Sequence, residues 1–165
     1  MKEQIQNPEK FEIKKLTSED SANYWEIRQE MVSTDPQAFG FDEKNENENY
    51  WKEFISKPEN IFLATENNDN YISTGALAKY EEGEYFIKNV FTSELFRGKN
   101  LSQNILNQLI EEAKQKGIKK VSLWVNWGSS HDVAFNMYEK FGFKKTKEYI
   151  NEDKAFGSDY MEKFL

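Results

Sequence analysis

Residues suited to holding a phosphate group stand in the segment FRGKNLSQNIL, which covers residues 96–106. An Arg-Gly pair follows an expected strand there, and the chain then enters a strongly helical stretch that begins at Leu101. Backbone N–H groups at a helix N-terminus bind anionic oxygens, because the helix dipole lies behind them. A glycine lets the backbone approach a ligand closely and take left-handed angles, and Gly98 provides one such position. The segment therefore predicts a nest of N–H groups for phosphate between Arg97 and Ser102.

Asn100 and Ser102 stand where further glycines would be expected in a phosphate loop. Asn is the residue other than glycine that best tolerates a positive φ, so Asn100 can keep the loop geometry. Ser102 is small and can offer a hydroxyl, and Lys99 can add a positive charge near the phosphates. A second interpretation stays open, because Asn100 with Gln103 three residues later resembles the capping box that starts any helix.

The rest of the sequence excludes several classes of catalytic site. The chain has no Cys and a single histidine, His131, which rules out thiolate nucleophiles, Cys-based zinc sites and His-rich metal sites. The G-x-S-x-G elbow, H-E-x-x-H, the Walker A pattern and G-x-G-x-x-G are all absent. We therefore expect no metal, and the chemistry that remains is group transfer from a bound, activated donor.

Composition predicts a single domain, spanning residues 1–165, because 38% of the residues are apolar and 15% are aromatic. The formal net charge of −7 argues against nucleic acid as a partner, since such binding needs clustered Lys and Arg. No apolar run approaches the length that spans a bilayer, and the N-terminus lacks the apolar core of a signal peptide. These features predict a cytoplasmic protein without a membrane partner.

Hydrophobic periodicity predicts the element order β-α-α-β-β-β-α-β-α-β-β, which is an α/β fold (an α+β mixed sheet) with helices on both faces. The run VSLWV at residues 121–125 is typical of a strand covered on both sides. The last helix is expected to carry an apolar stripe that includes Val133 and Tyr138. Strands are expected at 10–16, 61–65, 71–80, 84–92, 121–125, 143–150 and 159–165, and helices at about 24–31, 50–55, 101–116 and before Gly142.

Two segments, taken together, resemble the GCN5-related N-acetyltransferase (GNAT) family. NVFTSELFRGKNLSQNIL, at residues 89–106, is similar to the strand, pyrophosphate loop and helix of that family. HDVAFNMYEKFGF, at residues 131–143, is similar to its N-x-x-A-x-x-L-Y-E-K-x-G-F pattern. IRQEMVSTDPQAFG, at residues 27–40, looks like the substrate-side helix and loop of many members. The expected element order also matches, so the resemblance spans nearly the whole chain and implies the acyl-CoA N-acyltransferase fold.

The resemblance implies an acetyl-CoA-dependent N-acetyltransferase. Such an enzyme moves an acetyl group directly to a primary amine of a small molecule or peptide, within a ternary complex. A non-catalytic acyl-CoA-binding module of the same fold stays open as the alternative, because the family pattern is Q/R-x-x-G-x-G/A and this chain reads R-G-K-N-L-S. The implied cradle for the pyrophosphate of acetyl-CoA consists of Arg97, Gly98, Lys99, Asn100, Leu101 and Ser102.

The resemblance also implies roles in catalysis. Tyr138 would be the general acid that protonates the departing CoA thiolate, since a phenol with a pKa of about 10 stays protonated at neutral pH. The alternative for Tyr138 is a core tyrosine with a hydrogen-bonded tip. Family members often deprotonate the amine with a strand carboxylate, for which Glu84 is the best-placed acid. A water chain without a single base is the alternative to Glu84.

Further contacts with the cofactor follow from the same resemblance. Backbone groups of Phe91 and Thr92 would pair with the pantetheine amides, and an N–H near Val90 would stabilise the oxyanion that forms when the amine attacks the thioester. His131 stands where many members have an Asn that contacts the pantetheine arm. The alternative for His131 is a solvent-facing side chain near a helix N-terminus.

The acceptor side is the least defined part of the sequence. It leaves a small polyamine, an amino sugar, an amino acid and a protein N-terminus or lysine all open as acceptors. A monomer and a homodimer are both open too, because an edge strand near the C-terminus could pair with a second copy. Glu30 could attract an ammonium group. The residues that the resemblance implies on this side are Trp25, Arg28, Glu30, Phe39 and Phe41.

Overall fold

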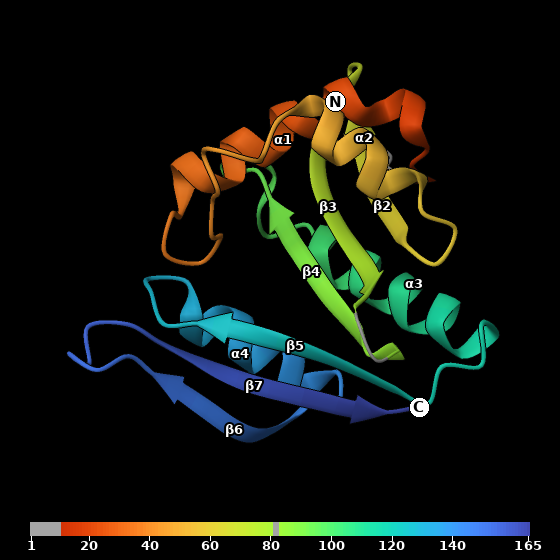
Figure 1. Ribbon diagram of the computed structural model, residues 1–165. Helices are drawn as coiled ribbons and strands as arrows, with labels where there is room; N and C mark the ends of the chain where they lie inside the picture. Colours follow the sequence, from red (N-terminus) through yellow and green to blue (C-terminus); the bar gives the residue numbers. More distant parts are fainter. Residues whose placement is uncertain (1–10, 81–82) are drawn as a thin grey trace, which may run out of the picture.

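The computed structural model describes residues 11–80 and 83–165, which form a seven-stranded mixed sheet with α-helices around it (Figure 1). The element order predicted from periodicity is confirmed, although residues 1–10, including the start of the first predicted strand, lie outside the described residues. The strands follow one another across the sheet in the order β1-β2-β3-β4-β5-β7-β6. The strands are β1 (Ile13–Lys15), β2 (Ile61–Asn67), β3 (Asn70–Lys79), β4 (Tyr85–Thr92), β5 (Lys120–Asn126), β6 (Lys144–Ile150) and β7 (Gly157–Phe164), and the α-helices are α1 (Ser21–Thr34), α2 (Glu48–Ser56), α3 (Leu101–Gln115) and α4 (His131–Lys140).

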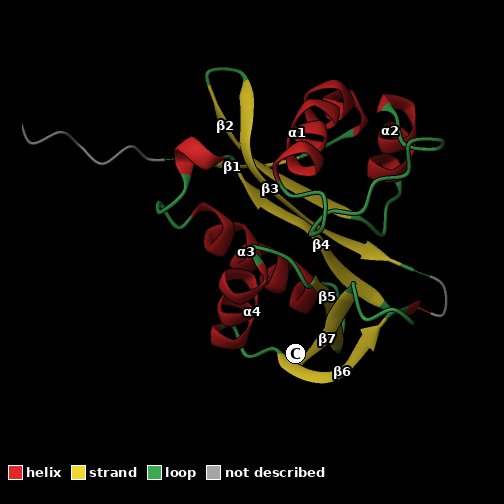
Figure 2. Cartoon of the chain, turned by 90° about the vertical axis from the view of Figure 1, so that its left-hand side faces the viewer, coloured by secondary structure: helices red, strands yellow, loops and turns green. Residues whose placement is uncertain are grey.

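The helices cover the two faces of the sheet in pairs. Figure 2 shows α1 and α2 on one face and α3 and α4 on the other. Each face has its own apolar core, which includes Tyr24 of α1 and Trp51 of α2 on one face, and Ile105 and Leu109 of α3 on the other. A Cβ at Gly75 of β3 would lie 2.7 Å from Cγ2 of Ile105, so a glycine there lets α3 pack closely on the sheet. Among the described residues, no helix is long and apolar enough to cross a membrane.

Strands β4 and β5 run parallel and separate soon after they begin. They pair at Tyr85 with Val121 and at Phe86 with Ser122, and beyond these pairs the two strands diverge (Figure 1). On its other edge, β4 stays paired with β3 as far as Thr92. The edge of β4 that faces β5 therefore carries backbone groups that the sheet does not use.

The prediction that both sides of residues 121–125 are covered is wrong for Trp124, which is 44% exposed. Helices α1 and α2 lie over the other half of the sheet and leave this face of β5 without a helix (Figure 2). Val133, expected on the apolar stripe of the last helix, is also exposed, whereas Tyr138 on the same helix is buried. Trp124 and Val133 both line a large cavity. Their apolar character thus belongs to a cavity wall and not to a core.

Candidate functional site

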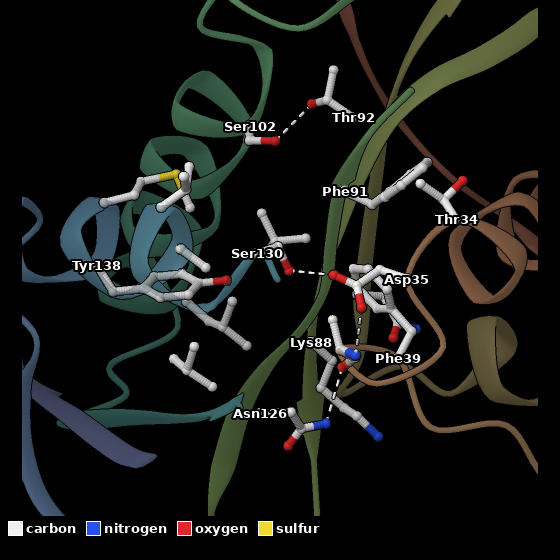
Figure 3. A pocket seen from close by; sticks show the side chains of 18 of the residues that line it. Thr34, Asp35, Phe39, Lys88, Phe91, Thr92, Ser102, Asn126, Ser130 and Tyr138 are labelled. Carbon is white, nitrogen blue, oxygen red and sulfur yellow. Dashed lines mark hydrogen bonds between the residues drawn. The ribbon is translucent and has the colours of Figure 1, made fainter. Parts of the chain in front are cut away.

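A cavity of about 1010 Å³ lies where β4 and β5 diverge. Its walls come from α1 and the loop after it, from β4, from the start of α3, from the end of β5 and from α4. Most of the site residues predicted from the sequence line this one cavity (Figure 3). They are Arg28, Phe39, Val90, Phe91, Thr92, Arg97, Gly98, Asn100, Leu101, Ser102, His131 and Tyr138.

Other predicted site residues stay outside the lining of this cavity. Glu84 is exposed and precedes β4, at the end where β4 and β5 are still paired. Because β4 and β5 separate only after Phe86, Glu84 lies at the end of β4 where the two strands are still close together. Trp25 stacks on Phe41, with ring centroids 6.3 Å apart. The predicted residues outside the lining are Trp25, Glu30, Phe41, Glu84 and Lys99.

The loop before α3 has the backbone shape of a phosphate nest. Gly98 has φ 79°, and Asn100 has φ 60° and ψ 22°, so the positive φ predicted at Asn100 is confirmed. Asn100 is the N-cap of α3, but its side chain makes no capping hydrogen bond, so the capping box with Gln103 does not form. The Asn104 N–H bonds back to the Asn100 carbonyl at 3.0 Å. The N–H groups of residues 101–103 precede this bond and have no acceptor within the helix, which is the condition for anion binding.

The Ser102 hydroxyl ties the nest to β4. Its Oγ lies 2.6 Å from Oγ1 of Thr92, which in turn lies 2.9 Å from Oγ of Ser73. Ser73 also donates to the carbonyl of Phe91 at 2.9 Å. This chain of hydroxyls fixes the first turn of α3 against the end of β4. Ser102 thus positions the nest, whereas the sequence suggests a hydroxyl offered to a phosphate.

Backbone groups of Val90 and Thr92 face the open edge of β4. The Ser93 N–H donates to the Ile72 carbonyl at 2.8 Å, and the Phe91 carbonyl is bound from the β3 side. Backbone groups point alternately to the two edges of a strand, so Val90 and Thr92, which flank Phe91, point away from β3. Of the edge contacts that the sequence predicts at Phe91 and Thr92, those at Phe91 thus face β3, and the Thr92 carbonyl already accepts from Nε of Arg97 at 3.3 Å.

A bulge beside Val90 is anchored to α1. The pairing of β3 with β4 shifts register between Thr74 and Ala76, and Asn89, on the bulged strand, has φ 51°. Nδ2 of Asn89 donates to the hydroxyl of Tyr24 at 2.8 Å. A bulge re-aims the residues next to it, so this bond from β4 to α1 helps to fix the direction of the Val90 N–H. Sequence reasoning missed Asn89, whose role depends on this bulge.

Tyr138 brings a phenol hydroxyl to the cavity. Its ring is buried on α4 and packs edge-to-face on Phe143, with centroids 5.8 Å apart. Figure 3 shows the hydroxyl pointing from α4 into the cavity. It makes no hydrogen bond with another described residue, so it is not the core tyrosine with a bonded tip that the sequence leaves as an alternative. Burial raises the pKa of Tyr138, which keeps the hydroxyl protonated.

Both ring nitrogens of His131 lie within hydrogen-bond distance of a carboxylate. Nε2 lies 2.7 Å from Oδ2 of Asp159 on β7, and Nδ1 lies 2.9 Å from Oδ1 of Asp132. A neutral imidazole has one N–H, so only the protonated ring can donate to both carboxylates. Asp159 also lies 2.8 Å from the ammonium of Lys145. His131 therefore has no free ring nitrogen for the cofactor contact that the sequence suggests. Its side chain instead joins α4 to β7.

We expect His131 to stabilise the fold more in mild acid than in mild base. Burial lowers the pKa of His131, but hydrogen bonds to Asp132 and Asp159 outweigh burial and raise it. A folded pKa above the unfolded value of about 6.5 gives stability that is complete below that value and lost as the pH rises through the folded pKa. Urea unfolding of the parent chain and of His131→Gln at about pH 5.5 and about pH 9 should show the larger gap at the lower pH. A gap that widens with pH would contradict this assignment.

The loop after α1 is fastened to the opposite wall of the cavity. The Ser130 hydroxyl donates to Oδ2 of Asp35 at 2.5 Å, and Nδ2 of Asn126 donates to the Ala38 carbonyl at 3.0 Å (Figure 3). Oδ1 of Asp35 also accepts from the Ala38 N–H at 3.1 Å. These bonds join the α1 side of the cavity to β5 and α4. Sequence reasoning missed Asp35, because an Asp before a proline indicates only the end of a helix.

Arg28 and Glu46 form a buried ion pair at the α1 side of the cavity. Nε and Nη2 of Arg28 each lie 2.9 Å from a carboxylate oxygen of Glu46. Nη2 also donates to the carbonyl of Gly40, and the guanidinium lies 5.4 Å from the ring centroid of Trp51. Glu46 stands in a polar stretch, residues 42–48, whose composition is that of a solvated loop. The sequence therefore gave no sign that this carboxylate is buried.

Lys88 adds a second cation to the same wall. It stands in the middle of β4, lines the cavity (Figure 3) and donates from Nζ to the hydroxyl of Tyr80. Burial, and then the charge of Arg28, lower the pKa of Lys88, while Glu46 opposes them. Sequence reasoning missed Lys88, although a lysine inside the apolar run YFIKNVF at residues 85–91 is a usable sign of a functional position.

Comparisons with known proteins give the family of the chain and the fold that it shares with solved structures. The model of the "Acetyltransferase (GNAT) family" matches residues 24–143. "Uncharacterized N-acetyltransferase YsnE" of Bacillus subtilis is 28% identical over 113 residues, which are 68% of this chain and 75% of that protein. A GNAT acetyltransferase from Streptococcus pneumoniae has the same fold, with a TM-score of 0.79 at 17% identity, over 94% of this chain and 100% of that chain. The PaiA N-acetyltransferase from Thermoplasma acidophilum, crystallised in complex with coenzyme A, gives a TM-score of 0.72 at 20% identity, over 95% of this chain and 100% of that chain.

Proposed function

The chain belongs to the acetyltransferase (GNAT) family, and on this premise we propose that it moves an acetyl group from acetyl-CoA to a primary amine. Transfer is direct, within a ternary complex of protein, acetyl-CoA and amine. The observation that supports this most strongly is that a helix N-terminal nest, a free strand edge and the Tyr138 hydroxyl all border one cavity. A relative that is named as an N-acetyltransferase supports an amine as the acceptor.

The start of α3 fits the pyrophosphate of CoA. The N–H groups of residues 101–103 have no acceptor within the helix, and Gly98 and Asn100 give the preceding loop its left-handed turns. Arg97 is exposed beside this loop and can add its charge. A relative of the same fold was crystallised with coenzyme A. When bound, acetyl-CoA supplies a thioester, whose carbonyl carbon is open to attack by an amine.

In this proposal Val90 and Tyr138 act on the two polar atoms of the thioester. The N–H of Val90 donates to the thioester oxygen as negative charge develops there. The hydroxyl of Tyr138 gives its proton to the sulfur as the carbon–sulfur bond breaks. Burial raises the pKa of Tyr138, whereas a thiol has a pKa of about 8.5. Because the phenol is the weaker acid, this transfer runs against the pKa order, so Tyr138 keeps its proton until the carbon–sulfur bond is largely broken and negative charge has built up on the sulfur.

Asp35 receives the amine. The described carboxylates that line the cavity are Asp35 and Glu46, and Glu46 is bound by Arg28. Within the described part of the chain, the Asp35 carboxylate accepts only from a hydroxyl and a backbone N–H, so its charge is available to an ammonium group. It holds that group and takes up its proton, directly or through water. This role replaces the one that the sequence suggests for Glu84, which does not line the cavity.

Two measurements test the proposed function. Calorimetry with acetyl-CoA shows whether the cavity takes the donor, and release of the CoA thiol is then followed against a panel of primary amines. We expect binding together with amine-dependent thiol release. Binding without release for any amine would favour the non-catalytic acyl-CoA-binding module, and no binding would contradict both functions.

We expect Asn100→Gly to bind acetyl-CoA as tightly as the parent chain or more tightly. Asn100 has φ 60° and its side chain makes no capping bond, so glycine removes a left-handed penalty of about 1 kcal/mol and loses no contact. Gly98→Val is the contrasting variant, because Gly98 has φ 79° and a β-branched residue there should weaken binding about tenfold. Calorimetry with acetyl-CoA measures both. A clear loss of affinity in Asn100→Gly would show that the Asn side chain itself holds the ligand.

We expect Asp35→Asn to lower kcat/KM for the amine about tenfold, because an amide cannot replace a charged hydrogen bond to an ammonium group. The affinity for acetyl-CoA should stay unchanged. Ser130→Ala is the matched control, since it removes the hydroxyl that binds Asp35 and leaves the carboxylate in place. An equal loss in both variants would mean that Asp35 acts only by fastening the loop.

A further inference from the structure

The α1 side of the cavity carries a positive charge that the protein does not balance. Arg28 and Glu46 neutralise each other through two hydrogen bonds. Lys88 donates from Nζ to the Tyr80 hydroxyl, and Nζ also lies 4.9 Å from the centroid of that ring. No carboxylate in the described ranges lies within ion-pair distance of Lys88. A cation in this position attracts an anion from outside the protein.

At Lys88 the effect of the Arg28 charge exceeds that of Glu46. Its side chain is only 4% exposed, and Nη1 has no hydrogen-bond partner among the described residues. Nε and Nη2 are taken by Glu46, so the ion pair turns one edge of the guanidinium away from the carboxylate. The charge of Arg28 is also felt at Lys88, where it opposes protonation of the ammonium. An anion placed beside Lys88 would offset both burial and this repulsion.

Aromatic side chains form flat walls beside these charges. Tyr50 and Tyr80 are each 39% exposed, and both line the cavity together with Trp124. The ring of Phe86 packs edge-to-face on Tyr80, with centroids 5.3 Å apart. Exposed aromatic surface that gathers around a cavity is suited to a flat apolar group of a ligand.

We propose, on the premise of the proposed function, that the acceptor is an amino acid with a flat, apolar side chain. Its carboxylate lies against Lys88, its ammonium against Asp35, and its side chain against Tyr50, Tyr80 and Trp124. A carboxylate, with one negative charge, matches the single positive charge of Lys88 better than a doubly charged phosphate does. A polyamine, by contrast, would bring further positive charge next to Lys88 and Arg28.

Matched pairs of acceptors test this assignment. L-phenylalanine carries a carboxylate where L-phenylalaninamide carries a neutral amide. Phenethylamine carries neither group. At saturating acetyl-CoA, we expect kcat/KM for the amino acid to exceed that for the amide about tenfold, as a charged hydrogen bond would give. The amino group of phenylalaninamide is less basic than that of phenylalanine, so a larger share of it is neutral and reactive at pH 7. This difference favours the amide and therefore works against the expected preference for the amino acid. A higher kcat/KM for the amide, or for spermidine, would overturn the proposal.

Variants of Lys88 assign the preference to this side chain. In Lys88→Met, the ratio of kcat/KM for phenylalanine to that for its amide should fall close to one, while Lys88→Arg should keep most of it. Lys144→Met is the matched control, because Lys144 is an exposed lysine on β6 and does not line the cavity. A ratio in Lys88→Met equal to that of the parent chain would overturn the role of Lys88.

A binding measurement separates this proposal from the proposed function. Calorimetry with CoA present compares 3-phenylpropionate with 3-phenylpropanamide, neither of which can be acetylated. We expect the carboxylate to bind more tightly, by a margin that Lys88→Met removes. Binding of this kind without acetylation of any amine would support the carboxylate site and contradict the transferase. Acetylation of amines without preferential binding of the carboxylate would leave the transferase standing and overturn the carboxylate site.

Discussion

Tyr138→Phe is expected to lower kcat about 10²-fold, which is the lower range for loss of a general acid. The hydroxyl points into the cavity and forms no hydrogen bond with another described residue. Its removal therefore leaves the packing of the ring on Phe143 intact. Affinity for acetyl-CoA should be unchanged, because the pyrophosphate nest belongs to α3 and the loop before it. Steady-state rates of thiol release and calorimetry with acetyl-CoA measure the two effects separately.

Tyr160→Phe is the matched control for Tyr138. The Tyr160 hydroxyl donates to Oγ of Ser122 at 2.8 Å in a buried site, and Tyr160 does not line the cavity. This variant should lose about 1 kcal/mol of unfolding free energy and keep its kcat. If Tyr138→Phe turned over as fast as the parent chain, the proton for the leaving thiolate would have to come from water, and Tyr138 would leave the mechanism.

The local parts of the site could be predicted from the sequence. A positive φ at Asn100 follows from the intrinsic tolerance of asparagine, and the start of α3 follows from the change of hydrophobic period at Leu101. These features depend on neighbours within a few residues. The backbone shape of this loop therefore follows from the local sequence, whereas its binding of a phosphate stays a prediction.

The features that depend on strand separation could not be predicted. The sequence does not indicate that β4 and β5 separate after Phe86. This separation leaves Glu84 at the end where the two strands are still paired, away from the cavity. The same holds for His131, whose Nε2 partner, Asp159, comes from β7. Periodicity indicates which face of a strand is apolar, but it does not indicate where two strands stop pairing. Trp124 looked like a core residue for another reason, because an apolar run does not indicate that α1 and α2 leave one face of β5 without a helix.

The charged residues on the α1 side of the cavity could not be predicted for a different reason. Glu46 and Lys88 come from a polar loop and from a strand, and each takes on its role only beside Arg28 of α1. A charged residue in sequence looks solvated until its partner is known, because burial of a charge depends on that partner. The Asp35 carboxylate is hidden in the same way, since its Ser130 partner lies far along the chain.

Arg28→Met is expected to lower the free energy of unfolding by about 3–5 kcal/mol, which is the cost of leaving the other member of a buried ion pair without its partner. Glu46 would lose both bonds from the guanidinium, and the carbonyl of Gly40 would lose its donor. Urea unfolding gives the change in free energy, and Lys114→Met is the surface control. Lys114 pairs with Glu111 at 3.0 Å on the exposed side of α3, so its loss should cost less than about 1 kcal/mol.

The double variant Arg28→Met with Glu46→Leu distinguishes a structural pair from one kept for the acceptor. Two apolar residues leave no unpaired charge, so much of the lost stability should return. The loop from Gly40 to Glu46 would then lose its hydrogen bonds to Arg28. The field at Lys88 would lose the contribution of Arg28 together with the smaller, opposite contribution of Glu46. We expect this variant to fold well yet to prefer phenylalanine over its amide less strongly than the parent chain. An unchanged preference would mean that Lys88 attracts the carboxylate without help, and that Arg28 serves the fold alone.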